Sequence, residues 1–528
     1  MAKVNIIGAG LAGLSAAITL AEQGYECNLI SNFPSERAQS VLAEGGINAA
    51  LDTCGEQDTV ENHFEDTMRG GVYLADPNAV WGLVQNAPQV VQRLADMGVP
   101  FNMENGRILL RSFGGQNKKR TAYAKSSTGK FLVYALIYES RKYEARGLIT
   151  RFCHHEFIRL LLEEERGVRV KDTYTGRQYD FVGNVILATG GINGVFPGMT
   201  TGTVHNTGDV TATVFAQGMR LSNLEMMQYH PTTIGISGKR MLVTEAARGE
   251  GGRLFVNREG SPWYFMEEKY PELKNLMPRD VVAREMYFVV RREDTDGQVY
   301  LDMRGLPGDV WKRKLSDLRE ELLHYLALDP AKEPIPVEPG IHYFCGGIDV
   351  DERHATNLAG VYAAGECCSQ YHGANRLGGN SLLGAVYGGK VAAQSVMADG
   401  DMKPQDGSVR AVDVSDAFAG EASPALIEEL GKHLYEGLGI VRSEADLSKA
   451  LGLVCELEDT CNCQRETARI ALAKAILKSA LARRESRGAH YREDYPDRDE
   501  TFQRITVADA GEGKICISWK DIPERRGV

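Results

Sequence analysis

The N-terminal segment constrains the fold of this chain more than any other. A short apolar run leads into a G-x-G-x-x-G turn formed by Gly8, Gly10 and Gly13, and a helical pattern then connects it to a second apolar strand ending near Ser31. Between a strand and a helix this motif is typical of dinucleotide binding, because the glycines bring the helix N-terminus against a pyrophosphate. The acidic residue that usually follows the second strand is replaced here by Ser31, whose hydroxyl can still hold a ribose.

A second strand of this kind occurs far along the chain. The segment N-V-I-L-A-T-G-G at 184–191 places Ala188, Thr189 and Gly190 where a buried strand ends in a glycine turn, and Asp209 opens another helical run. The repeat predicts one large nucleotide-binding domain that is assembled from separated segments.

The segment 363–382 carries the densest group of chemically specific residues. It combines glycines with Glu366 and Arg376 and contains almost no ordinary surface charge. Because glycine has no Cβ, the backbone here can approach a flat or phosphorylated ligand closely. The two charged side chains then lie beside that backbone, which favours a binding loop over a structural connection.

The chain is long enough for several domains, since 528 residues exceed what one hydrophobic core supports. A polar linker rich in Gly and Pro is expected at 399–407. The expected domains are the nucleotide-binding domain in two parts (1–223 and 342–398), an inserted domain (224–341), a helical domain (408–490), and a charged tail (491–528) that includes a short hairpin at 503–519.

Composition excludes several functional classes. The net charge of −11, with no Lys/Arg-rich face, argues against nucleic acid as a partner. No window of about 18 residues is uninterruptedly apolar, so no direct membrane span is expected. The pairs Cys367/Cys368 and Cys461/Cys463 have no partner pair at cluster spacing, so we expect no metal site. We expect a cytoplasmic protein.

A series of motifs identifies a family. They are A-E-G-G-I-N-A-A (43–50), F-G-G (113–115), A-T-G-G (188–191), Y-H-P-T (229–232), T-E-A-A-R-G-E-G-G (244–252), P-R-D (278–280), H-Y-F-C-G-G-I (342–348), H-G-A-N-R-L-G-G-N-S (372–381) and S-R-G-A-H (486–490). In their order and spacing the chain resembles the flavoprotein (catalytic) subunit of the succinate dehydrogenase/fumarate reductase family. The resemblance implies an α/β fold in which a Rossmann-like FAD-binding domain is split by an inserted α+β capping domain and followed by a C-terminal helical domain.

The resemblance also implies the chemistry. Hydride passes between flavin N5 and one alkene carbon of a small dicarboxylate (fumarate or succinate), and Arg279 protonates the other carbon. An arginine normally stays protonated, so Glu245 and Arg248 would form a relay that restores its proton. The implied substrate contacts are Phe113, His230, Thr244, His342 and Arg376. The same resemblance implies an iron–sulfur electron-transfer subunit as partner, through which the protein would associate with a membrane.

The FAD contacts that the resemblance implies come from every part of the split domain. They are Gly8, Gly10, Gly13, Ser31, Gln39, Ser40, Ala43, Gly45, Gly46, Ala188, Thr189, Gly190, Asp209, Glu366, Arg376, Ser381 and Leu382.

One departure from the family pattern affects the cofactor. Membrane-complex members have R-S-H-T or R-S-H-S before the E-G-G or Q-G-G turn, and that histidine bonds covalently to the flavin. Here the segment is R-A-Q-S, with Gln39 at the covalent position. An amide cannot be the nucleophile, so we expect non-covalent FAD, a more reducing flavin, and reduction of fumarate to succinate as the favoured direction.

Two alternatives stay open. L-aspartate oxidase also binds FAD without that histidine and has a similar S-R-G-x-H ending, but it carries an acidic residue where this chain has Phe113. A phenyl ring cannot satisfy the ammonium group of aspartate, so fumarate is the better fit. A related unsaturated dicarboxylate is the other alternative.

Overall fold

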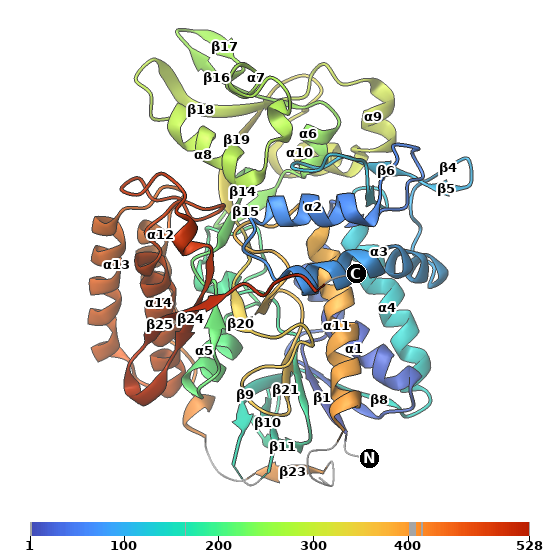
Figure 1. Ribbon diagram of the computed structural model, residues 1–528, viewed down its shortest axis with the longest axis vertical. Helices are drawn as coiled ribbons and strands as arrows, with labels where there is room; N and C mark the ends of the chain where they lie inside the picture. The colour runs from blue at the N-terminus through green and yellow to red at the C-terminus, as the bar shows by residue number, and fades with distance from the viewer. Residues whose placement is uncertain (1–2, 164, 401–407, 413–415, 527–528) are drawn as a thin grey trace.

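The computed structural model describes residues 3–163, 165–400, 408–412 and 416–526. Figure 1 shows a central α/β region, a smaller sheet domain above it, and a group of helices at one side formed by the C-terminal part of the chain. The α/β fold with an FAD-type domain, a capping sheet and a helical region agrees with the predicted class.

A parallel sheet forms the centre of the α/β region. Its strand order is β21-β12-β1-β2-β8, and β1 pairs in parallel with both β2 and β12. Strands β1, β12 and β21 are mostly apolar because layers cover both faces of the sheet, whereas the edge strand β8 also carries Thr150 and Arg151. The bounds of the sheet's strands are β1 (Val4–Ile7), β2 (Cys27–Ser31), β8 (Ile149–Cys153), β12 (Val185–Leu187) and β21 (Val361–Ala363).

Helices cover one face of this sheet. Helix α1 (Leu11–Glu22) packs against α11 (Asn380–Asp399) and α4 (Thr128–Glu144), and it shares a core with apolar side chains of β1 and β2. The predicted strand–turn–helix–strand unit is confirmed. Helices α2 (Val60–Gly70) and α3 (Pro77–Asp96) lie farther out, and α3 packs on α11.

An antiparallel sheet covers the opposite face. Its order is β23-β11-β10-β9, formed by β9 (His155–Leu161), β10 (Gly167–Asp172), β11 (Gln178–Val182) and β23 (Val409–Val412). The prediction of a helical region from 408 is wrong at its start, because β23 pairs with β11 and thus belongs to this sheet. Residues 401–407 of the predicted linker lie outside the described residues.

The capping domain is the upper sheet in Figure 1. Six antiparallel strands in the order β15-β14-β19-β18-β16-β17 enclose a separate hydrophobic core. The strands are β14 (Met227–Ile236), β15 (Lys239–Leu242), β16 (Arg253–Arg258), β17 (Ser261–Trp263), β18 (Thr295–Asp302) and β19 (Ile335–Phe344). The helices are α6 (Glu245–Gly249), α7 (Phe265–Lys269), α8 (Arg279–Val289), α9 (Gly308–Arg313) and α10 (Ser316–Leu326).

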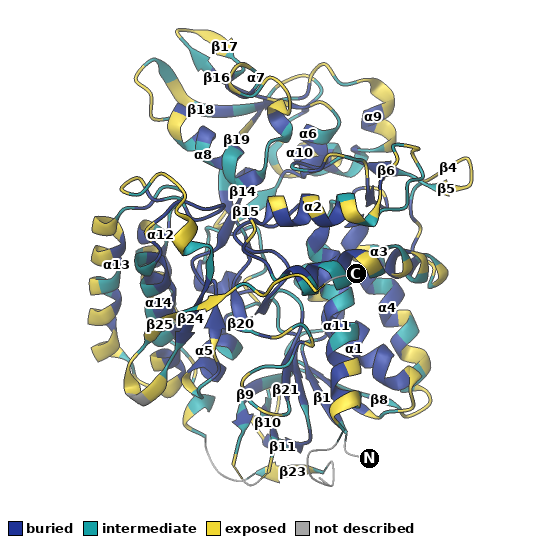
Figure 2. Cartoon of the chain, viewed as in Figure 1, coloured by how far each residue is buried: buried dark blue, intermediate teal, exposed yellow. Residues whose placement is uncertain are grey.

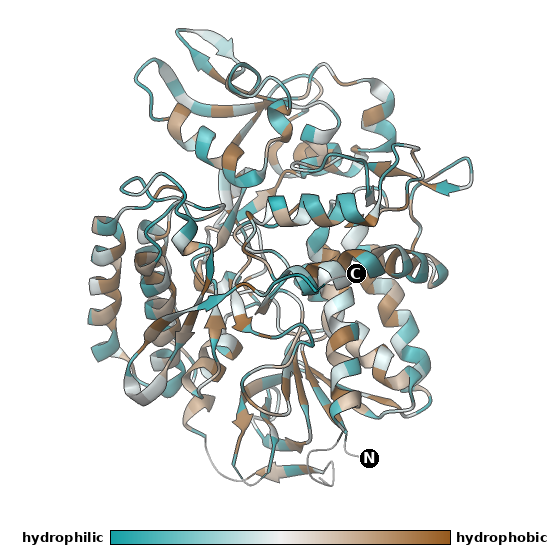
Figure 3. Cartoon of the chain, in the orientation of Figure 1, coloured by the Kyte–Doolittle hydropathy of each residue, from teal (hydrophilic) through white to brown (hydrophobic). Residues whose placement is uncertain are grey.

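The C-terminal helices are α12 (Pro424–Gly437), α13 (Glu444–Leu457) and α14 (Gln464–Ala482). Helix α14 packs on α5 (Asp209–Ala216), and Figure 3 shows α14 as largely hydrophobic. Figure 2 shows α13 as mostly exposed.

The predicted C-terminal hairpin is present as the antiparallel pair β24 (Arg504–Asp509) and β25 (Cys516–Asp521). The hairpin does not stand alone, because β24 also pairs with β13 (Leu221–Ser222). The other domain boundaries stay predictions.

Candidate active site

A cavity of about 1060 Å³ lies where the central parallel strands end, the edge at which open α/β sheets bind nucleotides. Most of the predicted FAD contacts line it. They are Gly8, Gly10, Ser31, Gln39, Ser40, Ala43, Ala188, Thr189, Gly190, Asp209, Glu366, Arg376, Ser381 and Leu382.

Three predicted cofactor glycines are not among the lining residues. A Cβ on Gly13 would lie 1.8 Å from the carbonyl oxygen of Gly8, so this glycine lets α1 pack closely on the turn. A Cβ on Gly45 would lie 2.7 Å from the ring of Phe113, and Gly46 has a φ of +142° against the backbone of Ala122. Close packing against backbone (Gly13 and Gly46) or against the Phe113 ring (Gly45) therefore already accounts for glycine at these positions, and direct cofactor contact by them stays a prediction.

Two helices have their N-termini at the wall of the cavity. Helix α1 begins after Gly10, and α11 begins beside Ser381; neither has an acidic residue in its first turn. Free N-terminal amides and the positive end of each helix dipole attract anionic or electron-rich groups. The chemistry of this wall fits a dinucleotide such as FAD, and α1 would hold its pyrophosphate.

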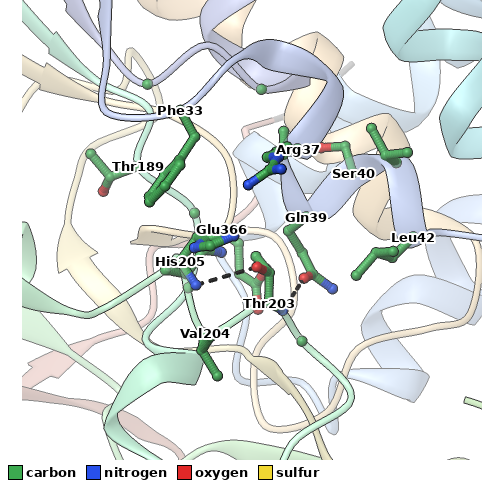
Figure 4. Close-up of a pocket in the computed structure, with 18 of the residues that line it drawn as sticks. Phe33, Arg37, Gln39, Ser40, Leu42, Thr189, Thr203, Val204, His205 and Glu366 are labelled. Carbon is green, nitrogen blue, oxygen red and sulfur yellow. Dashed lines mark hydrogen bonds between the residues drawn. The ribbon is translucent and has the colours of Figure 1, made fainter. Parts of the chain in front are cut away.

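Figure 4 shows part of the cavity wall, where the Gln39 side chain turns toward Thr203. Its Oε1 accepts a hydrogen bond of 2.6 Å from the Thr203 backbone amide. Glu366 accepts from the Phe344 amide at 3.1 Å. Burial raises the pKa of Glu366 to about 7, although the Phe344 amide and Arg376 act in the opposite direction.

Asp209 lines the cavity, but its carboxylate is already engaged. Arg469 Nε donates to it at 2.6 Å, and Arg465 lies 3.9 Å away. Asp209 therefore ties α5 to α14, and its predicted contact with FAD stays a prediction.

The predicted substrate residues gather at one end of the cavity. His342 and Arg376 line the cavity itself. The His230 ring lies 5.0 Å from the His342 ring, centroid to centroid. Phe113 is buried against Gly45 and Gly378.

Thr244 caps α6 by accepting from the Ala246 amide, the structural alternative to a substrate role. Burial raises the pKa of Glu44 well above its ordinary value, and the Thr244 side chain acts in the opposite direction.

The three predicted proton-transfer residues form a connected buried group. Arg279, the first residue of α8, donates from Nε to Glu245 at 2.9 Å and from Nη2 at 2.5 Å. Arg248 lies 3.4 Å from the other oxygen of Glu245. Burial raises the pKa of Glu245, but Arg279 and Arg248 outweigh it, so the net pKa is lowered and this carboxylate stays ionised.

Gln228 belongs to the site and was missed from the sequence. Its amide oxygen accepts from Arg279 Nη1 at 3.2 Å, and its amide nitrogen donates to the Arg376 carbonyl at 2.8 Å and to Asn375 at 2.7 Å. It precedes His230 by two positions on β14, and residues at this spacing share one face of a strand. This spacing from His230 was the sequence signal that could have identified Gln228 as a site residue.

The electrostatics of this end suit an anion. Arg279 and Arg376 are both buried, and His230 and His342 lie beside them. Burial, with a further contribution from Arg279, lowers the pKa of Arg376 to about 10, which still leaves it charged at neutral pH. Guanidinium groups bind carboxylates in a bidentate manner, so a small carboxylic acid fits here.

The two histidines are expected to stay neutral across the physiological range. Burial is the main cause that holds the pKa of both His230 and His342 well below the ordinary histidine value, and the positive charge of Arg279 is the second cause. Neither should therefore titrate between about pH 5.5 and about pH 7.5. Because the pKa of Glu366 in the same cavity lies near 7, the test must be specific to the histidines. We expect the pH profile of kcat/KM in His342→Gln to keep the shape of the wild-type profile, and a limb that disappears in this variant would contradict this.

A dinucleotide cavity that ends in buried arginines beside an Arg–Glu–Arg group defines a class of protein, the nucleotide-cofactor-dependent oxidoreductases. Comparison with protein families makes this specific. The model of the FAD binding domain matches residues 3–382, and the model of the fumarate reductase flavoprotein C-terminus matches residues 458–525. The chain belongs to the succinate dehydrogenase/fumarate reductase flavoprotein family, FAD-dependent oxidoreductases that act on a CH–CH bond.

Similar proteins agree. The succinate dehydrogenase flavoprotein subunit of Bacillus subtilis is 37% identical, over 96% of this chain and 93% of its own. The fumarate reductase flavoprotein subunit of Haemophilus influenzae is 33% identical, over 96% and 91%. A solved structure of Escherichia coli quinol fumarate reductase FrdA superposes with a TM-score of 0.85 at 29% identity, covering 99% of this chain and 96% of that one. These matches do not favour the L-aspartate oxidase alternative.

Two further findings concern the described residues only. None of their helices combines the length and the apolar character needed to cross a bilayer. No group of three or more His, Cys, Asp or Glu side chains among them is arranged to hold a metal ion.

Proposed function

We propose that this chain is the catalytic subunit of a reductase that converts fumarate to succinate with non-covalently bound FAD. The observation that carries the direction is Gln39. It lines the cavity at the position where the family's covalent histidine stands, and its oxygen is already bonded to the Thr203 amide. A carboxamide is no nucleophile toward the flavin, so the cofactor keeps an unsubstituted 8α carbon and a lower potential.

Bound FAD would supply the hydride exchange with the substrate CH–CH bond. The chain itself supplies the grip on the substrate. Arg376, His342, His230 and Thr244 would hold the two carboxylates, and the Phe113 ring would press the substrate against the cofactor. Since Arg279 and Arg376 are both cationic, they would also stabilise charge that develops on the substrate during reduction.

Arg279 would donate the proton. Its guanidinium is buried, and Glu245 holds it through two hydrogen bonds. Glu245 also contacts Arg248, so a proton lost from Arg279 can be replaced along this chain of three side chains. The third guanidinium nitrogen of Arg279 donates to Gln228, and Gln228 in turn donates to the Arg376 carbonyl, so the two arginines are linked.

The electron donor would be another subunit. The relatives cited above are named as flavoprotein subunits, and one from Wolinella succinogenes is named for an 8-methylmenaquinol:fumarate reductase. We therefore propose an iron–sulfur partner that passes electrons to this chain, and association with a membrane through such partners.

The direction and the attachment can be tested on one preparation. We expect acid precipitation to leave the yellow colour in the supernatant, and fumarate reduction by reduced viologen to be faster than succinate oxidation by a dye. Aspartate with oxygen should give no turnover. Colour retained in the pellet would contradict the role of Gln39, and faster succinate oxidation would contradict the direction.

A further inference from the structure

Arg376 is a buried cation that forms no ion pair with any described carboxylate. The residue is 3% exposed, and its Nε has no hydrogen-bond partner among the described residues. The other two arginines of the site share the carboxylate of Glu245, whereas no ion pair to Arg376 occurs within the part of the chain that the structure describes. The carboxyl of Glu366 influences Arg376 only from beyond ion-pair distance.

An aromatic ring takes the place of the missing carboxylate. The guanidinium carbon of Arg376 lies over the Tyr343 ring, 4.3 Å from its centroid. A cation over an aromatic face is attracted by the ring quadrupole, and the attraction grows when both groups are desolvated. Tyr343 is 7% exposed and lines the same cavity as Arg376.

The ring itself is held firmly. Tyr343 lies on β19 and pairs in register with Gln228 of β14. The His372 ring meets it edge-on at 5.2 Å, and the apolar side chains of Val72, Met226 and Cys345 belong to the same buried cluster. The ring therefore offers a fixed plane against which the guanidinium can be aimed.

This arrangement solves a problem specific to an anion site. A carboxylate would orient Arg376 but would also neutralise it and compete with the substrate, while an aromatic face orients the cation and leaves its N–H groups free. We infer that Tyr343 is a positioning residue that aims Arg376 at one carboxylate of the substrate. The inference rests on the proposed function, since it takes a dicarboxylate as the ligand.

Three variants of the FAD-loaded protein test it. Tyr343→Leu should raise KM for fumarate, and the dissociation constant of malonate measured from flavin absorbance, by about tenfold, because Arg376 without the ring must be ordered when the anion binds, and immobilising one long side chain costs about that factor. Its kcat should change little, since Arg376 is ordered alike in the bound ground state and in the transition state. Tyr343→Phe keeps the ring face and should restore most of the affinity.

Tyr362→Leu is the matched control. It removes another buried tyrosine ring, on β21, from outside the cavity lining, so it should lower stability without changing KM. The inference is overturned if Tyr343→Leu binds malonate within about twofold of wild type, if Tyr343→Phe is as impaired as Tyr343→Leu, or if a crystal structure of Tyr343→Leu shows Arg376 unmoved. If wild type neither binds malonate nor reduces fumarate, the proposed function fails and the inference falls with it.

Discussion

Arg279→Ala is expected to lower fumarate reduction by about 10² to 10⁴-fold, the range that one general acid contributes, while the protein still binds FAD. The reason is geometric. The Arg279 guanidinium donates hydrogen bonds to both Glu245 and Gln228. No other described side chain donates a hydrogen bond to Glu245. Among the described residues the Arg279 guanidinium forms hydrogen bonds to Glu245 and Gln228, and neither of these lines the cofactor cavity. The measurements are kcat with reduced viologen and the ratio of flavin to protein.

Arg284→Ala is the control on the same helix. Arg284 also lies on α8, but its guanidinium packs over the Tyr491 ring at 4.9 Å, so its loss should leave turnover near the wild-type value. Near-normal activity in Arg279→Ala would exclude it as the proton donor. Loss of flavin in that variant would instead point to a structural role.

The nucleotide-binding half of the fold could be predicted from sequence because its signals are local. Glycines at fixed spacing between a buried strand and an apolar helix specify the turn, and β1, α1 and β2 follow one another around it in the predicted order, with β2 ending at Ser31. The cavity then follows from topology, since parallel strands present their carboxyl ends at one edge.

Long-range pairing was not predictable in the same way. The V-R-A-V segment at 409–412 carries no sign that it will pair with β11, which lies far back in the chain. Gln228 is similar: its contact with the Arg376 carbonyl joins residues 148 positions apart. The local sequence around Gln228 indicates a strand, but only the register of β14 against β19 aims its amide at the two arginines.

The family motifs name residues without saying how they are held. Arg376 and Arg279 both appear in motifs, yet one is held by an aromatic ring and the other by a carboxylate. That difference depends on which side chains the fold brings to each guanidinium. On the proposed function, this difference decides how each arginine would act. Arg376, which has no carboxylate partner among the described residues, would bind an anion, and Arg279, which is linked to Glu245, would give up a proton.

The S-R-G-A-H segment shows the same dependence on the fold and gives the largest expected stability effect. Glu485, just before it, accepts from Arg483 Nη1 and from Arg487 Nε, each at 2.8 Å, and all three side chains are buried. Glu485→Gln removes the only carboxylate that Arg487 contacts among the described residues, and leaving a buried charge uncompensated costs about 3 to 5 kcal/mol. We expect the urea unfolding midpoint to fall accordingly.

An exposed pair supplies the comparison that isolates burial as the cause. Glu267 binds Arg253 through two hydrogen bonds of 2.7 and 2.6 Å, geometry as good as that of Glu485, but the arginine side chain is 46% exposed. Glu267→Gln should therefore cost less than about 1 kcal/mol. Equal losses in the two variants would mean that hydrogen-bond geometry, and not the desolvated charge, sets the stability of the S-R-G-A-H segment. This segment supports the active site directly, because the Ala489 amide donates to the Ala374 carbonyl.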